Sequence, residues 1–464
     1  MSDKKTKHPY SKQSPEYLMR KVVDACTDCD CCRYIMETSC QFFPKIYELW
    51  DREKETGEQI NAQALRQLAD LCNYCALCPC PNIREDIITA KTGFIDREGL
   101  APHIRTLEDV ERVGKLCGAV PGLANLLLQQ QTTSSIIKRF VGINPERKLP
   151  VFPNEDFPTW TKRRGLDRKN RPGSKRKIAY FAGCTARYLF PEVPKAVVEI
   201  FEHQDIAVYY PEQHCCGMPS MLEGDRHLTL QFADRMINQL DEIVADGYEI
   251  VCSCSTCGYM LKQALRERAY YSDAYQELVG GDERHMIIPE ETALNQTRQR
   301  ILAKNIYNEI LNDEGYFSRI DPLKRIRVAE NTYDLGEYLL NLLECGVLVQ
   351  PKAGISEKMV YYPPCHLREQ EIGTPFLKVL SQIPGISIES FSSTFYCCGI
   401  AGIMGFKKDF HDASIQMGSP LMEKIKELDP DILVTDCLSC RLQFNQLSEY
   451  PVKHPVEILR QSYI

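Results

Sequence analysis

The chain has 464 residues, more than a single hydrophobic core usually serves, so two or three domains are expected. Its net charge of −7 excludes the basic surface that nucleic-acid binding through phosphate contacts requires. Cysteine is unusually frequent, at 22 residues, and the polar, lysine-rich N-terminal stretch has no apolar segment that would direct secretion. We therefore expect a cytoplasmic protein whose reduced thiols bind metal, and not a disulfide scaffold.

Nine cysteines lie near the N-terminus, between Cys26 and Cys80, and the spacing C-x2-C-x2-C occurs there twice. In bacterial ferredoxins such a triplet binds one [4Fe-4S] cluster, and the cysteine that follows it binds the other cluster. We therefore predict that residues 1–115 form a helical, ferredoxin-like domain with two cubane [4Fe-4S] clusters. The predicted ligands are Cys26, Cys29, Cys32 and Cys80 for the first cluster, and Cys72, Cys75, Cys78 and Cys40 for the second.

The N-terminal pattern departs from that of bacterial ferredoxins in its spacing before Cys40 and Cys80, and Cys31 can replace Cys32 as a ligand. A pair of zinc sites would also use thiolates, although zinc ligands usually come as C-x2-C pairs and not as triplets. The segment Ile60–Leu71 is predicted to be a short helix between the two binding segments.

Residues 116–175 are predicted to join the N-terminal domain to the rest of the chain, with a boundary near residue 175. The stretch Leu116–Phe140 is apolar enough to serve as a docking helix for a partner. The basic run Lys162–Arg176 is typical of a solvated linker and can also contact anionic lipid. No stretch reaches the ~20 apolar residues of a membrane span, so any membrane contact is expected at the surface or through a partner.

The rest of the chain contains an internal repeat. KIAYFAGC, ending at Cys184, is matched by KMVYYPPC, ending at Cys365, and HCCG is matched by YCCG. EIVCSCSTC, ending at Cys257, is matched by DILVTDCLSC, ending at Cys440. Matching cysteines are 181 to 183 residues apart, which indicates a duplication. We assign the two copies to residues 176–345 and 346–464.

Each copy alternates short apolar runs with helical stretches, which predicts a parallel α/β sheet. The predicted strands are IAYFAGC, IAVYYP and EIVCSC in the first copy and MVYYPPC, ISIESF and DILVTDC in the second. The predicted helices are Pro194–His203, Leu228–Ala245 and Ser419–Leu428. Because ligands gather at the carboxyl ends of parallel strands, we expect the cysteines that follow these strands to meet there. Residues 282–326 are expected to form a charged, helix-prone insertion.

Each copy has five cysteines at matched spacing: one alone, an adjacent pair followed by glycine, and C-x2-C. Five thiolates exceed what tetrahedral zinc uses, and an adjacent pair can bind two irons of a larger cluster. Zinc in one copy, and Cys252 as a ligand in place of Cys254, stay open as alternatives. His214 and His366 adjoin these cysteines and are candidates for proton transfer in catalysis, or for hydrogen bonds to cluster sulfur.

These features resemble the CCG-domain iron–sulfur family, which includes heterodisulfide reductase catalytic subunits and the C subunit of anaerobic glycerol-3-phosphate dehydrogenases. The cysteine spacing carries the resemblance, together with CCGIAGIMGFKKDF (397–410) and DILVTDCLSCRLQF (431–444). The resemblance implies an α+β multi-domain fold with two α/β CCG repeats related by a pseudo-twofold duplication. It also implies one or two noncubane [4Fe-4S] clusters, bound by Cys184, Cys215, Cys216, Cys254 and Cys257 and by Cys365, Cys397, Cys398, Cys437 and Cys440.

Electron transfer is the function that the resemblance implies. The chain would relay electrons from a flavoprotein dehydrogenase to a quinone or another carrier, at the cytoplasmic face of a membrane that holds a quinone-reactive partner. A disulfide reductase that acts at a noncubane cluster is the alternative. The chain has no GxGxxG or Walker A loop, so flavin is expected in another subunit. The complete first repeat and the insertion depart from the glycerol-3-phosphate dehydrogenase pattern, and they leave the substrate of the complex open.

Overall fold

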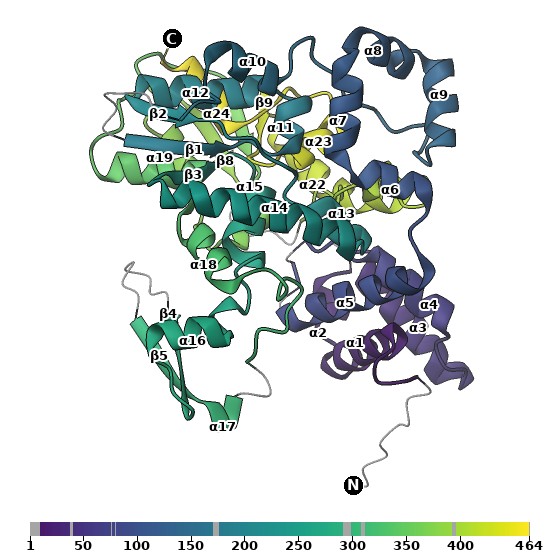
Figure 1. Ribbon diagram of the computed structural model, residues 1–464. Helices are drawn as coiled ribbons and strands as arrows, with labels where there is room; N and C mark the ends of the chain where they lie inside the picture. The colour runs from purple at the N-terminus through teal and green to yellow at the C-terminus, as the bar shows by residue number, and fades with distance from the viewer. Residues whose placement is uncertain are drawn as a thin grey trace.

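The computed structural model describes residues 10–37, 40–75, 77–78, 80–169, 176–290, 298–307, 311–391 and 396–463. Figure 1 shows a helical N-terminal part, drawn in purple, beside a larger part that contains two parallel sheets. The boundary predicted near residue 175 lies outside the described residues, as do parts of the predicted insertion.

The N-terminal part is helical, as the sequence predicts. Its helices are α1 (Pro15–Cys29), α2 (Cys31–Ile35), α3 (Phe42–Thr56), α4 (Ala62–Leu71) and α5 (Pro81–Glu98). Helix α1 begins at Ser14, whose hydroxyl accepts a hydrogen bond from the Tyr17 amide, and ends at Asp30, which is in the left-handed region at φ 58°. This reversal brings α2 back against the end of α1, so the cysteines of both helices face one region.

The next segment contains more helices than the sequence predicts. They are α6 (Pro102–Glu108), α7 (Val110–Ala119), α8 (Pro121–Gln129), α9 (Gln131–Phe140) and α10 (Phe157–Arg164). The single docking helix predicted over residues 116–140 is therefore wrong: Pro121 starts a new helix and Gln130 is extended, so the stretch is divided among α7, α8 and α9. In the part of the chain that the structure describes, no helix is long and apolar enough to span a bilayer.

The first repeat forms a parallel sheet in the order β2-β1-β3-β6. Its strands are β1 (Arg176–Phe181), β2 (Ile206–Tyr209), β3 (Glu249–Cys252) and β6 (Thr332–Asp334). Its helices are α11 (Cys184–Tyr188), α12 (Glu192–His203), α13 (Met218–Glu223), α14 (Arg226–Ala245), α15 (Ser255–Tyr259), α16 (Asp273–Val279), α17 (Lys304–Tyr307), α18 (Pro322–Glu330) and α19 (Leu335–Glu344), with short turns η1 (Met260–Ala264) and η2 (Ala269–Tyr271).

The second repeat forms the equivalent parallel sheet, in the order β10-β9-β7-β8. Its strands are β7 (Lys358–Tyr361), β8 (Ser387–Ser390), β9 (Ile432–Val434) and β10 (Val452–Lys453). Its helices are α20 (Cys365–Arg368), α21 (Pro375–Leu380), α22 (His411–Leu428), α23 (Leu438–Leu447) and α24 (Pro455–Gln461), with a short turn η3 (Met404–Phe406). The two predicted α/β repeats with parallel sheets are therefore confirmed.

The insertion differs from the prediction of a helix-prone excursion. Its described part contains an antiparallel pair, β4 (His285–Glu290) and β5 (Arg298–Ala303). Ile287 of β4 lies directly opposite Ile301 of β5, and such β-branched cross-strand pairs favour a sheet over a helix. Of its described charged residues, Glu290, Arg298 and Arg300 lie on these strands, whereas Lys304 lies on α17 and Lys324 and Arg325 lie on α18.

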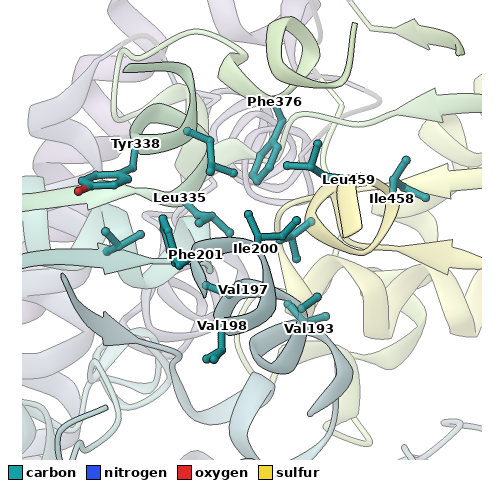
Figure 2. Close-up of a cluster of buried hydrophobic side chains, with 14 of the residues drawn as sticks. Val193, Val197, Val198, Ile200, Phe201, Leu335, Tyr338, Phe376, Ile458 and Leu459 are labelled. Carbon is teal, nitrogen blue, oxygen red and sulfur yellow. The ribbon is translucent and has the colours of Figure 1, made fainter. Parts of the chain in front are cut away.

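The two repeats share one hydrophobic core (Figure 2). Helix α12 of the first repeat packs against α24 of the second, and α19 of the first packs against α21 of the second. The buried side chains that meet there include Val197 and Phe201 of α12, Leu335 of α19, Phe376 of α21 and Leu459 of α24. This reciprocal packing fixes the two sheets relative to one another, and so fixes where their cysteines lie.

Candidate functional site

A single cavity of about 330 Å³ lies at the carboxyl ends of both sheets. Its wall includes nine of the ten repeat cysteines; only Cys215 of that set does not line it. The nine are Cys184, Cys216, Cys254, Cys257, Cys365, Cys397, Cys398, Cys437 and Cys440, and Cys75 of the N-terminal part joins them. Cysteines that are far apart in the sequence thus surround one space.

The opposite wall of the cavity is apolar and comes from the segment between α6 and α10. The side chains that line it there include Val110, Val113, Leu128, Ile137, Val141, Leu149 and Phe152. The volume is within the range of small-molecule sites, which are mostly apolar with a few polar groups. The segment predicted to be a linker therefore forms part of the candidate site.

Local backbone geometry brings the cysteines of each repeat close together. Gly183, at φ 75°, connects β1 to α11, and a Cβ at this position would lie 2.9 Å from the Cys257 sulfur. The glycines that follow the adjacent pairs, Gly217 and Gly399, both have φ 86°. Only glycine adopts this left-handed conformation without strain, so the sharp turn expected from the CCG motif is present in both copies.

Sulfur atoms approach one another within and between the repeats. Cys184 and Cys215 are 3.7 Å apart at their sulfurs, and Cys398 and Cys440 are 3.1 Å apart. Cys254 of the first repeat is hydrogen-bonded to Cys437 of the second. The two predicted ligand sets are therefore neighbours, and not separate sites on opposite faces of the molecule.

The N-terminal cysteines form two neighbouring groups. Cys26 lies close to Cys29, Cys32, Cys78 and Cys80, and Cys40 lies close to Cys72 and Cys75. Cys78 lies near members of both groups. Cys75 is a hydrogen-bonded neighbour of Cys397 in the second repeat.

Thiol neighbours change the acidity of several repeat cysteines. Hydrogen bonds with Cys397 and Cys440 lower the pKa of Cys398 to about 6, although its burial opposes this shift. Hydrogen bonds with Cys254 and Cys440 lower the pKa of Cys437 well below its ordinary value. The same hydrogen bonds raise the pKa values of Cys254, Cys397 and Cys440 well above the ordinary value, so each such bond joins a thiol to a thiolate.

The two candidate histidines occupy different places. His366 is buried and lines the cavity, and its ring stacks on Tyr259 at 5.0 Å. Its Nε2 donates to the Tyr74 carbonyl (3.2 Å), which leaves Nδ1 to accept from the Thr256 hydroxyl (3.0 Å); burial lowers the pKa of His366 and favours this neutral ring. His214 does not line the cavity and lies beside Glu111.

The spacing leaves two ligand positions open: Cys252 or Cys254, and Cys31 or Cys32. Cys252 is buried on β3 and does not line the cavity, whereas Cys254 does. Cys31 and Cys29 are exposed, and Cys32 is half-buried near Cys26. The assignment of Cys254 and Cys32 as ligands stays a prediction.

Sequence reasoning missed several polar residues around the cysteines. The Asn73 side chain donates to the Cys397 sulfur at 3.6 Å, and Thr256 Oγ1 is 3.6 Å from the Cys437 sulfur. Glu111 of α7 accepts a hydrogen bond from the Cys215 amide at 3.0 Å. Asn73 and Thr256 adjoin a cysteine triplet or pair, which is a usable signal, but nothing local in the sequence points to Glu111.

The donor set fits iron–sulfur clusters. Thiols dominate the polar groups on the cavity wall, and thiolate is the usual ligand of cluster iron. Among the described residues, no three His, Cys, Asp or Glu side chains gather tightly enough to hold a single metal ion. The feature that fits an iron–sulfur cluster is the large number of thiols around one cavity.

Comparison with known proteins agrees with this geometry. The cysteine-rich domain family CCG matches residues 178–262 and 359–445. The chain is 23% identical over 365 residues to the C subunit of anaerobic glycerol-3-phosphate dehydrogenase of Escherichia coli, with 78% of each chain covered. It is 24% identical over 294 residues to lactate utilization protein A of Exiguobacterium, covering 61% of this chain and 97% of the relative. It is 23% identical over 301 residues to the B subunit of fumarate reductase (CoM/CoB) of Methanothermobacter marburgensis, covering 63% of this chain and 47% of the relative.

Proposed function

Because this chain is a protein with two CCG cysteine-rich domains, homologous to the C subunit of anaerobic glycerol-3-phosphate dehydrogenase, we propose that it is the iron–sulfur subunit of an oxidoreductase complex. In that role it relays electrons between a flavoprotein dehydrogenase and a quinone or similar carrier. One observation carries the proposal: the four groups of cysteines are successive neighbours, and cysteines of both repeats line one cavity together with Cys75.

We assign the cubane ligands as the spacing predicts and the noncubane ligands as the family resemblance implies. Two cubane clusters belong to Cys26, Cys29, Cys32 and Cys80 and to Cys40, Cys72, Cys75 and Cys78. Two noncubane clusters belong to Cys184, Cys215, Cys216, Cys254 and Cys257 and to Cys365, Cys397, Cys398, Cys437 and Cys440. Bound clusters supply one-electron transfer, with potentials that the surrounding hydrogen bonds and burial tune.

The exposure of the cysteines indicates where each partner can approach the relay. Cys29 and Cys80, in the first N-terminal group, are exposed and can approach a flavoprotein. The repeat cysteines at the other end of the row are buried, apart from the half-buried Cys365. We therefore place the flavoprotein at the N-terminal end and the acceptor at the cavity.

The cavity suits a lipophilic acceptor. The apolar part of its wall can contact the ring and side chain of a quinone, beside the clusters that the cysteines would hold. Reduction of a quinone to a quinol takes two electrons and two protons. His366 lines the cavity and is the candidate for proton transfer, whereas His214 does not line it.

Disulfide reduction in the same cavity is the second candidate function. The observation that favours it is that nine repeat cysteines from two neighbouring sets line one space, where a small disulfide would meet both sets. Such a reaction would take two electrons and two protons to give two thiols.

Anaerobic reduction of the purified chain, followed by addition of single acceptors, tests the proposal. We expect about sixteen irons per chain, from four clusters of four irons. Rapid reoxidation by a short-chain quinone, without thiol release from glutathione disulfide or a heterodisulfide, supports the relay. Thiol release in step with reoxidation would instead establish the disulfide reductase, and a preparation without acid-labile sulfide would contradict both functions.

A further inference from the structure

Helices α7, α8 and α9 expose large apolar side chains to solvent. The exposed residues are Leu116 and Val120 at the end of α7, Leu123, Leu126 and Leu127 of α8, and Ile136 and Phe140 of α9. Phe140 is 90% exposed and Ile136 is 70% exposed. Figure 1 shows α8 and α9 projecting at the edge of the molecule, on the side away from the shared core. Clustered apolar exposure of this kind marks an interaction surface.

The charged residues between positions 112 and 145 are all basic. Between residues 112 and 145 there are four basic residues, Arg112, Lys115, Lys138 and Arg139, and no aspartate or glutamate, in a chain whose net charge is −7. Arg112 and Arg139 are exposed beside the apolar residues, as is Lys115, which is ion-paired with the buried Glu111 at the start of α7. A short helix with apolar residues outward and basic residues around them is typical of helices that lie in the interface of an anionic bilayer.

The same helices form the apolar wall of the cysteine cavity. Leu128 of α8 and Ile137 of α9 line the cavity, whereas their neighbours Leu127 and Ile136 are exposed. Only the thickness of this helical layer therefore separates the outer apolar surface from the cavity.

We propose that α7, α8 and α9 lie on the surface of an anionic lipid bilayer and hold the cavity next to the hydrocarbon, from which a lipid-soluble acceptor enters. The lipid contact stands on the exposed side chains and charges alone, and the entry of an acceptor rests on the proposed function. A protein partner is a poorer match for this surface, because the exposed cysteines that a flavoprotein would approach, Cys29 and Cys80, lie at the end of α1 and the start of α5.

Flotation of the full chain, with its clusters, on vesicles of phosphatidylcholine and phosphatidylglycerol tests the proposal. We expect binding that falls about ten-fold for each of the substitutions Leu126→Ser, Ile136→Ser and Phe140→Ser, since burying one such side chain contributes roughly one factor of ten or more. Ile301→Ser is the matched control, because Ile301 is 68% exposed but lies on β5 in the insertion. This control should bind vesicles as the unaltered chain does.

Charge provides a second arm of the test. Arg139→Gln should weaken binding to the anionic vesicles about five-fold and leave the weaker binding to pure phosphatidylcholine unchanged, because one basic residue near an anionic surface contributes about 1 kcal/mol. Failure of the unaltered chain to bind anionic vesicles would overturn the proposal. Equal reductions of vesicle binding by Ile301→Ser and Ile136→Ser would also overturn it.

Reduction of a water-soluble dye by the reduced chain distinguishes a failure of the electron relay from a failure of the lipid contact. Ile136→Ser and Phe140→Ser should keep full iron content and full dye reduction while they lose reoxidation by a long-chain quinone held in vesicles. If the unaltered, reduced chain does not reduce the dye, the relay proposal is wrong, and the lipid-contact proposal is not affected. If the variants instead lose a flavoprotein partner and keep vesicle binding, the surface binds protein and the lipid proposal is wrong.

Discussion

Two glutamates close to the cavity have opposite electrostatic environments. Glu108 is fully buried at the end of α6, and neither of its carboxylate oxygens accepts a hydrogen bond from the described residues. Burial, together with the nearby carboxylate of Asp225, raises the pKa of Glu108 to about 9. Burial opposes ionisation of Glu111 as well, but hydrogen bonds from His214 and Lys115 outweigh it and lower the pKa of Glu111 to about 2.

Glu108 makes folding stability fall as the pH rises. Its folded pKa lies above the ordinary value, so between pH 4.5 and about 9 the folded chain holds a proton that the unfolded chain releases. We predict that Glu108→Gln stabilises the chain by about 1–3 kcal/mol at pH 8 and has little effect at pH 4. Denaturant unfolding at both pH values, under anaerobic conditions, measures this.

Glu111→Gln is the matched control for Glu108→Gln. The folded pKa of Glu111 is below its ordinary value, so its contribution is present above pH 4.5 and is lost as the pH falls towards 2. This variant should therefore be destabilised at pH 8. Equal changes in stability for the two variants would show that the environments described for them are wrong.

The pair Cys252 and Cys254 offers a second test at this scale. Only Cys254 lines the cavity, and Cys252 packs within β3. We predict that Cys254→Ser loses up to about four irons per chain, whereas Cys252→Ala retains them all. Iron and acid-labile sulfide analysis of the two purified variants checks this. Loss of iron from Cys252→Ala with retention in Cys254→Ser would reverse the assignment.

At the scale of the elements, the two CCG turns are alike in backbone and unlike in surroundings. Gly217 and Gly399 have the same φ of 86°. A Cβ on Gly217 would be 3.4 Å from its nearest neighbours, in ordinary contact range, whereas a Cβ on Gly399 would be 2.2 Å from the Ser414 carbonyl oxygen of α22. The second repeat therefore has no room for a side chain where the first has some.

This difference predicts unequal effects of the same substitution. Gly217→Ala should cost about 1–2 kcal/mol, the strain of a left-handed alanine. Gly399→Ala should cost about 2–5 kcal/mol, because α22 must also move. Denaturant unfolding of the two variants measures the difference, and iron content should fall more for Gly399→Ala. Equal costs would mean that α22 is displaced easily.

At the scale of the whole molecule, the shared core couples the stability of the two repeats. Phe376 of α21 in the second repeat packs on Gly336 of α19 in the first, where a Cβ would lie 2.7 Å from its ring. We predict that Phe376→Ala costs about 3–5 kcal/mol and increases amide hydrogen exchange in the strands of both repeats.

The control for Phe376→Ala is Leu421→Ala. Leu421 is fully buried in a core that belongs to the second repeat alone. Its truncation should increase exchange chiefly in β7, β8 and β9. Exchange confined to the second repeat in both variants would contradict a shared core.

The sequence by itself determined the duplication, the helical N-terminal part and the strands that precede the cysteines, because these depend on local patterns and on spacing. It did not reveal β6 and β10, since three- and two-residue strands carry almost no periodic signal. Yet both strands lead into helices with capping boxes, Asp334 with Glu337 and His454 with Glu457, and this spacing is readable in the sequence.

Tertiary structure alone decided that the cysteine sets meet and that an apolar helical layer covers them. Cys254 and Cys437 are 183 residues apart in the sequence, and they become neighbours only because α12, α19, α21 and α24 pack reciprocally in one core. The same packing places residues 106–152 over the cavity. Local sequence encodes which thiols are available, but the relative position of two sheets depends on long-range burial, which no local pattern records.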